Sequence, residues 1–376
     1  MAPDPQQSST RVPPASAARP AVGRLRPYRP GKPLDELERE LGITDSIKLA
    51  SNENPLGPSP RALEAIELAA REVRLYPDNE CHDLVTGLAA HWGVERETLF
   101  VDRGSTGVMR QLALAYLQPG DECVMGDPSF MVYEFSTVLM GATPVKVPLT
   151  ADCTHDLDAM ADAITDRTKL VFIANPDNPH GSMVTHDTLA RFLARVPPHV
   201  LVVADEAYYE YAVQRDDYPD TLALWRGGAP VMMLRTFSKV YALAGLRVGY
   251  AIAQPEILRP MFQVREPFHI TNIAQAAALA SLSDPEQVAR ARAVNAAGLQ
   301  VLQAGFDRLG LRHLPTAANF VFVEVGRPGR EVYDALLRTG VIVRPGDIFD
   351  RPNWLRVTVG TPEQCARLIE ALGTVL

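Results

Sequence analysis

The stretch MMLRTFSKVYALAGLRVGY, from Met232 to Tyr250, decides how this chain is interpreted. A short apolar run leads to Thr236, Ser238 and Lys239, and Arg247 follows the lysine by eight residues. The chain has only five lysines, so arginine supplies nearly all of its positive charge. A lysine that arginine has not replaced suggests that the amine itself is used. Lys239 is therefore the first candidate for a chemical role.

Apolar runs and helical segments alternate on both sides of this stretch. Short apolar runs separated by helices predict a mostly parallel sheet that is covered on both faces. We expect helices at 62–73 and 107–117, and strands at 98–102, 121–127, 142–149, 169–176, 200–207 and 230–239. The sequence therefore predicts an α/β fold from about residue 60.

The last third of the chain has a different pattern. A long helix is expected at 286–310, with strands at 319–325, 341–346 and 354–360. The final helix begins with Thr361 as N-cap, Pro362 in the first turn and Gln364 three residues after the cap, which predicts a capping box. This third is typical of a smaller α+β domain.

These patterns divide the chain into four parts. Residues 1–24 are rich in Pro, Ser, Gln and Ala and are expected to be a disordered tail. Residues 25–55 are expected to form an N-terminal arm that packs with the small domain. A large domain is expected at 56–282 and a small C-terminal domain at 283–376, because the boundary falls near SDPEQ.

Composition excludes several classes of function. The net charge of −8 argues against nucleic acid or an anionic membrane as the main partner. The four scattered cysteines predict neither a disulfide framework nor a zinc site and fit a reducing cytoplasm. The eight histidines show no HExxH spacing, so no metal site is expected. No run of eighteen apolar residues predicts a membrane span, and the N-terminus lacks the apolar core of a secretory signal.

Polar residues follow five of the predicted strands, and ligands of parallel sheets bind beyond the carboxyl ends of strands. We therefore expect one crevice lined by these strand ends: Arg103–Thr106, Asp127–Phe130, Asn175–Gly181, Asp205–Tyr208 and Thr236–Lys239.

Two of these segments suit a phosphate group. RGSTG places backbone amides and hydroxyls at a helix N-terminus, and Thr236, Ser238 and Arg247 add further donors. There is no GxGxxG and no Walker lysine pattern. A lysine and a carboxylate beside a phosphate site suggest pyridoxal phosphate. Each piece alone has a plain structural explanation: Asp205 as a strand cap, the Asn-Pro run as a turn, Phe130 as core and Arg247 as a surface ion pair. The ordered set favours the functional interpretation.

Several segments together resemble a known family. The chain is similar to class I/II pyridoxal-phosphate aminotransferases of fold type I, specifically the histidinol-phosphate aminotransferase branch. The resemblance runs from Leu25 to the C-terminus. The segments that carry it are LRPYRPGKP, KLASNENPLGPSP, LYPD, FIANPDNPHG, ADEAYYEY, RTFSKVYALAGLRVGY and LRVTVGTPE.

The resemblance implies roles for the residues around the cofactor. Lys239 matches the lysine that forms a Schiff base with the cofactor, Asp205 the carboxylate that keeps the pyridine nitrogen protonated, and Tyr208 the tyrosine at the ring 3′-oxygen; these three are the expected catalytic residues. Asn178 and Phe130 match the partner of that tyrosine and the ring-stacking aromatic. The expected phosphate-binding residues are Gly104, Ser105, Thr106, Thr236, Ser238 and Arg247. Tyr76 matches a tyrosine that reaches the cofactor of a neighbouring subunit, which implies a homodimer.

The resemblance also implies a substrate site. Arg356 matches the arginine that binds the substrate carboxylate, and Tyr28, Asn54 and Arg344 match positions that line the pocket. Lys239, once released from the cofactor, would move a proton as a general base. The expected small-molecule partners are an amine donor and a 2-oxo acid acceptor, with 2-oxoglutarate as the expected acceptor.

Three stretches, with four positions, depart from the branch pattern. Gly107 stands where an acidic residue is usual. In DNPHG, Asp177 and His180 stand where Asn and Thr are usual. His269 stands where Asn is usual. His180 and His269 are included among the expected substrate-binding residues; they are either neutral replacements or residues that reshape the substrate pocket. We therefore expect either histidinol phosphate as donor or an aromatic or specialised amino acid. A decarboxylase or oxidase on the same fold, and a cofactor-sensing regulator, are rival functions.

Overall fold

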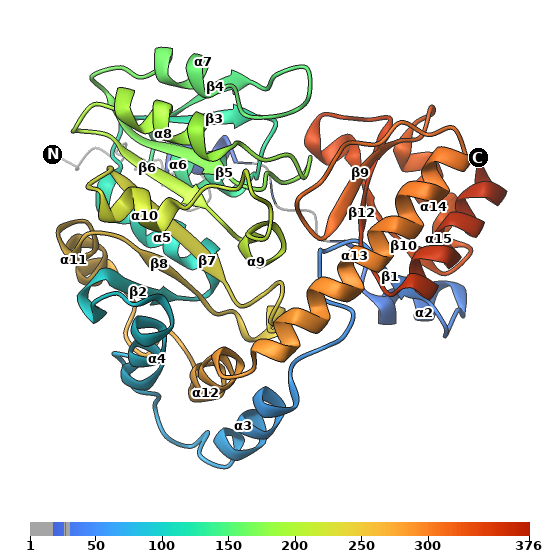
Figure 1. Cartoon of the computed structure of the whole chain (residues 1–376), viewed down its shortest axis with the longest axis horizontal. Coiled ribbons are helices and arrows are strands. Elements are labelled where there is room, and N and C mark those ends of the chain that lie inside the picture. The colour runs from blue at the N-terminus through green and yellow to red at the C-terminus, as the bar shows by residue number, and fades with distance from the viewer. Residues whose placement is uncertain (1–17, 26, 28–30) are drawn as a thin grey trace, which may run out of the picture.

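The computed structural model describes residues 18–25, 27 and 31–376. Within that part of the chain a seven-stranded sheet forms the centre of the larger region (Figure 1). Its strands, in their order across the sheet, are β2 (Leu99–Asp102), β8 (Gly249–Ile252), β7 (Val231–Thr236), β6 (Leu201–Asp205), β5 (Thr168–Ala174), β3 (Glu122–Asp127) and β4 (Thr143–Pro148).

All neighbouring strands of this sheet are parallel except β8, which is antiparallel to both β2 and β7. The predicted α/β fold with a mostly parallel sheet is confirmed. β8 was not predicted from the sequence; it follows β7 after a turn at residues 237–248. That turn includes the 3-10 helix η3 (Ala244–Leu246) and Arg247, whose φ is 55°.

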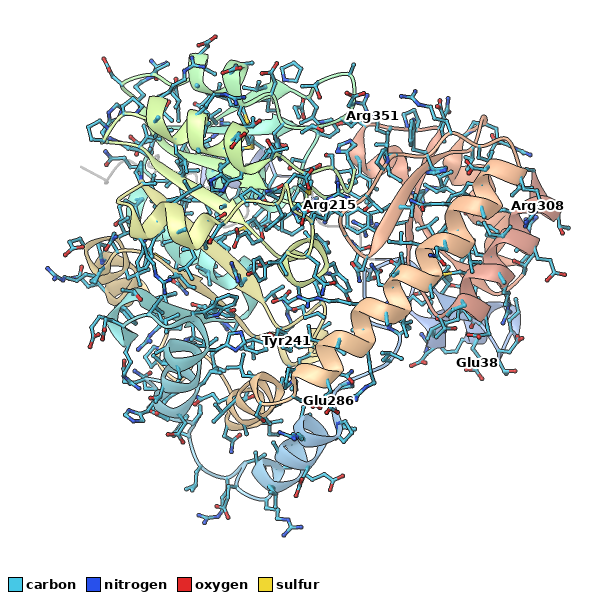
Figure 2. All side chains as sticks on the ribbon, in the orientation of Figure 1. Glu38, Arg215, Tyr241, Glu286, Arg308 and Arg351 are labelled. Carbon is cyan, nitrogen blue, oxygen red and sulfur yellow. The ribbon has the colours of Figure 1, made fainter. Side chains whose placement is uncertain are left out.

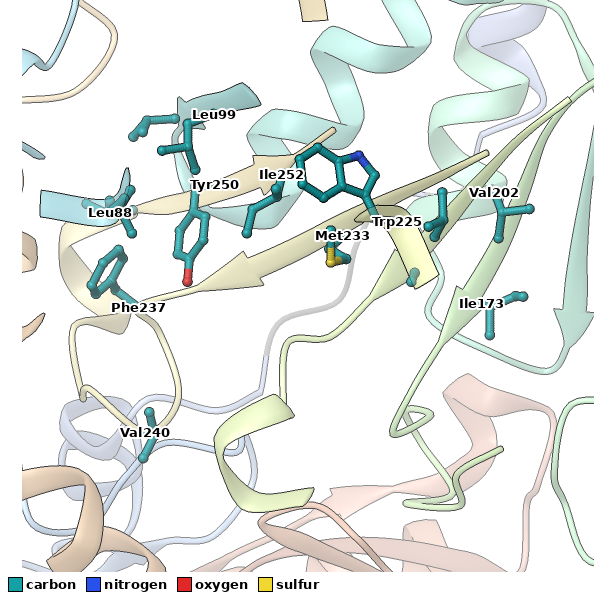
Figure 3. Packing of buried hydrophobic residues seen from close by; sticks show 14 of the residues in the cluster. Leu88, Leu99, Ile173, Val202, Trp225, Met233, Phe237, Val240, Tyr250 and Ile252 are labelled. Carbon is teal, nitrogen blue, oxygen red and sulfur yellow. The ribbon is translucent and has the colours of Figure 1, made fainter. Parts of the chain in front are cut away.

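Helices cover both faces of the sheet, and alternate strand residues enter two separate cores. In β6, Val202 and Ala204 join one core, and Leu201 and Val203 join the other. The strands are therefore apolar on both sides, which explains their continuous apolar runs. Figure 3 shows the first core, with Met233, Val202 and Ile173 from successive strands. The helices of this region are α3 (Pro60–Ala70), α4 (His82–Trp92), α5 (Gly104–Tyr116), α6 (Val132–Leu139), α7 (Leu157–Asp162), α8 (His186–Arg195), α9 (Tyr209–Ala212), α10 (Thr221–Arg226), α11 (Pro255–Val264) and α12 (Asn272–Leu282).

A second, smaller sheet lies beside the first (Figure 1). Its described strands are antiparallel, in the order β11 (Arg344–Pro345), β12 (Trp354–Thr358) and β9 (Phe320–Glu324). The helices that cover it are α13 (Pro285–Arg308), α14 (Gly329–Leu337) and α15 (Pro362–Val375). The capping box predicted at Thr361 and Gln364 is present. We call this sheet and its helices the small-sheet region, and the seven-stranded sheet with α3 to α12 the large-sheet region.

The strand predicted at 341–346 is divided between two sheets. β10 (Val341–Ile342) pairs with β1 (Ile47–Lys48), and β11 pairs with β12. The N-terminal segment thus joins the small-sheet region, where α2 (Leu34–Leu41) adds Leu37 to the core. Pairing across nearly 300 residues leaves no local signal in the sequence.

Two further features concern the chain ends and the long helix. Residues 1–17 of the predicted tail lie outside the described residues, and α1 (Pro20–Gly23) forms a helical turn against α6, where the tail was expected to be disordered.

Helix α13 contributes Ala291 to a core of the large-sheet region and Phe306 to the core of the small-sheet region. Figure 2 labels Glu286 and Arg308 near its two ends. The domain division near residue 282 stays a prediction. No helix among the described residues is long and apolar enough to cross a membrane.

Candidate active site

A cavity of about 250 Å³ lies at the carboxyl ends of the parallel strands. The segments after β2, β3, β5, β6 and β7 all contribute to its wall, so the structure brings the five predicted strand ends together. Among the residues predicted to hold a cofactor, those that line it are Ser105, Thr106, Phe130, Asn178, Asp205, Tyr208, Thr236, Ser238, Lys239 and Arg247.

Lys239 is held on the cavity wall by the turn after β7. Its neighbours Phe237 and Val240 are fully buried in the core (Figure 3), so the chain is anchored on both sides of the lysine. Lys239 Nζ donates a hydrogen bond to the carbonyl oxygen of Ser51 at 3.2 Å. Burial, and then the positive charge of Arg356, lower the pKa of Lys239 to about 7. A neutral amine is therefore available at Lys239 near neutral pH.

Asp205 is the last residue of β6 and is buried at the cavity. Its Oδ2 accepts a hydrogen bond from the Tyr133 hydroxyl at 2.8 Å, and its Oδ1 accepts one from the Ala207 amide at 3.2 Å. Burial raises the pKa of Asp205 to about 6, although the Tyr133 hydrogen bond acts in the opposite direction. A cationic nitrogen in the cavity would favour the ionised form of this carboxyl group.

A set of anion-binding groups forms another part of the cavity wall. Ser105 and Thr106 stand in the first turn of α5, where free backbone amides and the helix dipole favour an anion. Arg247 Nη1 donates to Ser238 Oγ at 3.2 Å, and Thr236 Oγ1 donates to the same oxygen at 2.9 Å. These groups suit a multiply charged oxyanion such as a phosphate.

Gly104 lies behind these donors rather than in the cavity lining. Its φ is 71°, a left-handed conformation that favours glycine, and a Cβ atom there would stand 2.6 Å from Arg247 Nη2. A side chain at position 104 would therefore displace the guanidinium. Gly104 allows the close approach of Arg247 to the start of α5.

Tyr208 and Asn178 lie on the same wall and have different partners. The hydroxyl of Tyr208 accepts a hydrogen bond from Asn52 Nδ2 at 2.8 Å. Asn178 Oδ1 accepts one from Arg356 Nη1 at 2.6 Å. The ring of Phe130 also lines the cavity and meets the Tyr133 ring edge to face, with centroids 5.6 Å apart.

None of the predicted substrate residues that the structure describes lines this cavity. Arg356 on β12 and Arg344 on β11 are buried and stand opposite each other in the small sheet. Arg344 lines a separate hollow of about 290 Å³ together with Gly31. Asn54 Nδ2 donates to the carbonyl oxygen of Val240, next to Lys239, at 2.7 Å. Tyr28 lies outside the described residues.

The remaining predicted residues also lie outside the cavity lining. His180 is fully buried and forms a 2.6 Å hydrogen bond with Asp177. His269 is buried and its Nε2 lies 2.8 Å from the carbonyl oxygen of Val101. Tyr76 is 82% exposed and stacks on Phe268, with ring centroids 4.7 Å apart.

Sequence reasoning did not identify four residues at the site. Tyr133 donates to Asp205, Asn52 donates to Tyr208, and Ser51 and Glu53 line the cavity beside Lys239. The segment SNENPLG contains Ser51, Asn52 and Glu53, but the family resemblance assigned a role only to its Asn54. Tyr133 follows Phe130 by three residues at the start of α6, a spacing that could have indicated a shared face.

Comparison with known proteins gives consistent results. A model of the family "Aminotransferase class I and II" matches residues 44–372. The chain is 51% identical over 359 residues to a histidinol-phosphate aminotransferase of Moorella thermoacetica, with 95% of this chain and 92% of the relative covered. It is 48% identical over 362 residues to a histidinol-phosphate aminotransferase of Symbiobacterium thermophilum, with 96% and 99% covered. Among solved structures it is similar to histidinol-phosphate aminotransferase from Sinorhizobium meliloti in complex with pyridoxal-5′-phosphate, with a TM-score of 0.87, 30% identity and 96% and 97% coverage.

Proposed function

The chain belongs to the aminotransferase class I and II family and is a pyridoxal-5′-phosphate-dependent aminotransferase of fold type I, and we propose that it transfers an amino group from histidinol phosphate to 2-oxoglutarate. The observation that carries the proposal is the convergence of Lys239, Asp205 and the anion-binding groups on one cavity. The identity of the donor is supported by the names and the high coverage of the relatives.

The donor set of the cavity fits the cofactor. The hydroxyls at the start of α5 and after β7, together with Arg247, would bind the phosphate. Asp205 would accept a hydrogen bond from the ring nitrogen, and Tyr208 and Asn178 would contact the ring oxygen. The Phe130 ring would cover a face of the cofactor. These assignments rest on the position of each group in the cavity wall and on the family resemblance.

Bound pyridoxal phosphate supplies an electron-withdrawing ring that stabilises negative charge at the substrate Cα. The chain supplies the acid–base groups. Because the pKa of Lys239 is about 7, its Nζ can take or give a proton near neutral pH. Asp205 would favour a protonated ring nitrogen, since its buried carboxylate gains most from a cationic partner.

Arg356 would bind the anionic end of each substrate in turn. Arg356 and Arg344 are buried and stand opposite each other on neighbouring strands. A guanidinium group of Arg356 or Arg344 would attract a phosphate or a carboxylate. The phosphate of histidinol phosphate and a carboxylate of 2-oxoglutarate could therefore use the same arginine. An aromatic or specialised amino acid as donor, and a decarboxylase or oxidase reaction, remain the alternatives.

The surface around Tyr76 favours a homodimer. Leu75 and Tyr76 are exposed by 52% and 82%, and Val73 and Phe268 are also exposed nearby. Clustered exposed apolar side chains mark an interaction surface. Tyr76 lies outside the lining of the cavity in its own chain, so a role at the cofactor requires a second copy. We propose a cytoplasmic location, because the four cysteines are free thiols, as in a reducing compartment.

A half-reaction screen tests the donor. The holoenzyme is mixed separately with histidinol phosphate, phenylalanine, tyrosine, arginine and glutamate, and the loss of the visible absorbance of the lysine-bound cofactor is followed. We expect histidinol phosphate to react fastest and glutamate to appear when 2-oxoglutarate is added. An inert histidinol phosphate beside another reactive amine would overturn the donor and leave the family unchanged. Release of carbon dioxide, or consumption of oxygen without glutamate formation, would favour the rival reactions.

A further inference from the structure

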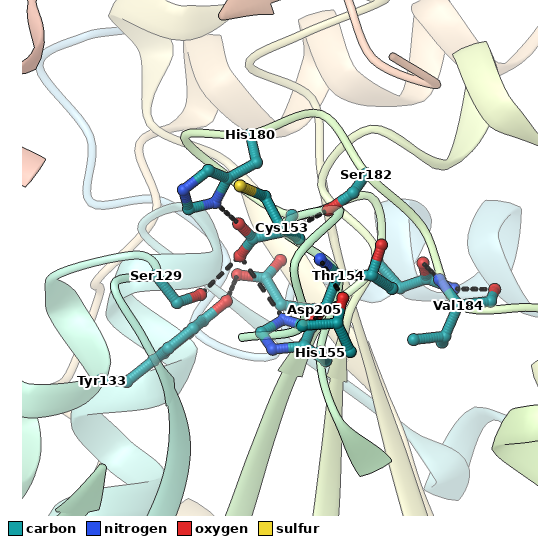
Figure 4. A network of polar contacts seen from close by, with 12 residues as sticks. Ser129, Tyr133, Cys153, Thr154, His155, His180, Ser182, Val184 and Asp205 are labelled. Carbon is teal, nitrogen blue, oxygen red and sulfur yellow. Dashed lines mark hydrogen bonds and ion pairs between the residues drawn. The ribbon is translucent and has the colours of Figure 1, made fainter. Parts of the chain in front are cut away.

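A buried polar cluster that includes Ser129, His155 and His180 lies beside Tyr133 and Asp205 of the cavity wall (Figure 4). Asp177 is at its centre. Its Oδ2 forms a hydrogen bond with His180 Nδ1 at 2.6 Å, and its Oδ1 accepts a hydrogen bond from Ser129 Oγ at 2.5 Å. His155 Nε2 lies 3.4 Å from the same Oδ1. Three side chains from three segments therefore converge on one carboxylate.

The cluster is sealed from solvent and holds a negative charge. The exposed fractions of Asp177, His180 and His155 are 0%, 0% and 4%. Burial alone would raise the pKa of Asp177, but the hydrogen bonds from His155 and His180 hold it below the ordinary value. Among the described residues, no three His, Cys, Asp or Glu side chains are arranged to hold a metal ion. His180 Nδ1 is a hydrogen-bond partner of Asp177, and His155 Nε2 makes a longer contact with the same carboxylate, at 3.4 Å.

Asp177 also forms the base of the turn that carries Asn178. Its amide donates to the carbonyl oxygen of Ser182 at 2.8 Å, and its carbonyl oxygen accepts from the amide of Gly181 at 2.8 Å. His180 lies within this turn and returns its ring to the side chain of Asp177. The turn is thus closed twice, by the backbone at its base and by the His180–Asp177 hydrogen bond inside it.

This turn connects the large-sheet region to the small-sheet region at the cavity. Asn178 Oδ1 accepts from Arg356 at 2.6 Å, and the Gly181 carbonyl oxygen accepts from the Ala317 amide at 2.8 Å. The edge of the His180 ring packs on Phe322, with centroids 5.4 Å apart. Phe322 stands opposite Arg356 in the small sheet. A displacement of the turn would therefore disturb Arg356 from two directions.

We propose that Asp177 and His180, supported by Ser129 and His155, are positioning residues that hold the amide of Asn178 against Arg356 and thereby fix the substrate-binding arginine. This inference rests on the proposed role of Arg356 in binding the anionic end of the substrate. It assigns a function to two of the positions at which the chain departs from the family pattern. His180 and Asp177 act through Asn178 and do not contact the substrate.

The test compares two substitutions of His180. His180→Asn keeps a donor nitrogen one bond from Cγ, as in the Nδ1 position of histidine, and can still bond to Asp177. His180→Leu covers Phe322 but has no donor, so it leaves the buried carboxylate with one hydrogen bond fewer. His313→Leu is the matched control, because His313 also bonds an aspartate, Asp307 at 3.1 Å, and packs on Phe306, away from the cavity.

The first readout is amide hydrogen exchange of the cofactor-free protein. His180→Leu should speed exchange at Gly181 and Ala317 by about tenfold, whereas His180→Asn and His313→Leu should stay within about threefold of the unmodified protein. The second readout is steady-state kinetics of the holoenzyme. His180→Leu should raise the KM for 2-oxoglutarate by about tenfold, with kcat changed by less than about threefold.

The outcomes separate this inference from the proposed function. If His180→Leu lowers the melting temperature but leaves exchange at both amides and the KM unchanged, the cluster is merely structural and the proposal is overturned. If His180→Leu does not fold, Asp177→Asn replaces it, and unchanged exchange and KM in that variant overturn the proposal. If the unmodified holoenzyme transaminates no 2-oxo acid, the proposed function fails, and the exchange readout still decides the positioning of the turn.

Discussion

Asp205 and Glu206 are adjacent buried carboxyl groups with opposite surroundings. Glu206 Oε2 accepts two hydrogen bonds from Arg235, from Nε at 2.9 Å and from Nη2 at 2.7 Å. The Arg235 guanidinium lies between the rings of Trp92 and Tyr209, at 3.9 and 3.4 Å from their centroids. Asp205 accepts hydrogen bonds from two neutral donors, the Tyr133 hydroxyl and the Ala207 amide.

The partner of each carboxyl group distinguishes a charge that stabilises the fold from a charge that is available to a ligand. A buried carboxylate that has a bidentate cationic partner is compensated within the fold. Asp205 has a raised pKa, at about 6, and lies on a cavity, so it gains most when a ligand brings a positive charge. Lys239 resembles Asp205 in having a shifted pKa at the cavity. Burial and Arg356 lower the pKa of Lys239 to about 7.

Replacement of Lys239 is the most direct test of the chemical role proposed for the charged groups at the cavity. Lys239→Ala removes the amine that joins the cofactor and moves the proton, so transamination should fall by at least about 10⁴-fold. The visible absorbance of the lysine-bound cofactor should disappear. Lys169→Ala is the control, since Lys169 is a partly buried lysine outside the cavity lining. An unchanged visible spectrum in Lys239→Ala would refute the assignment.

Replacement of Glu206 tests whether the buried Glu206–Arg235 pair stabilises the fold. Glu206→Ala leaves the buried Arg235 without its anion and should lower the free energy of unfolding by about 3–5 kcal/mol. Urea denaturation measures the change. The control is Glu286→Ala, which breaks a solvent-exposed i,i+4 pair with Arg290 at 3.7 Å and should cost less than about 1 kcal/mol. Equal effects of the two substitutions would contradict the comparison.

Asp205→Asn should separate activity from stability. The amide has no negative charge for the ring nitrogen, so kcat/KM should fall by about 10²–10³-fold, while the protein still folds. Steady-state kinetics and circular dichroism of one preparation provide both measurements. A loss of structure as large as that of Glu206→Ala would show that Asp205 is a structural carboxylate.

The pH dependence of stability gives a further test of Asp205 in the cofactor-free protein. Folding raises the pKa of this group from 3.8 to about 6, so the folded state binds the proton more tightly than the unfolded state. Its contribution to stability is complete below about pH 4 and is lost as the pH rises through about 6. Denaturation midpoints between pH 4 and 7 should show this decline, and Asp205→Asn should reduce it. An identical decline in the variant would assign it to other groups.

Tyr133→Phe should have the smallest effect. It removes one neutral hydrogen bond to Asp205, so activity should fall by about tenfold or less. The Tyr133 hydrogen bond opposes the rise in the Asp205 pKa, so the stability decline should shift to higher pH. Tyr116→Phe, which loses a 2.9 Å hydrogen bond to the carbonyl oxygen of Ile257, is the control. A shift to lower pH in Tyr133→Phe would contradict the assigned role.

The sequence by itself determined the α/β class and the strand ends at which Lys239 and Asp205 stand. Continuous apolar runs such as residues 169–174 require a sheet that is buried on both faces, and the structure provides one core for each face. The polar residues at the ends of these runs then lie at one edge of the sheet. This part of the site depends on local pattern, which a sequence displays directly.

The tertiary structure alone decided which of these polar residues meet. Asn52 contacts Tyr208 and Thr358, which lie 156 and 306 residues away, and β1 pairs with β10. The sequence placed His180 among the substrate residues, and the structure places it behind the wall, on Asp177. Asp205 ends β6 and Glu206 follows it, but one side chain lies at the cavity and the other contacts Arg235. Their roles depend on long-range packing, because the electrostatic environment of a buried group is set by whichever distant segments surround it.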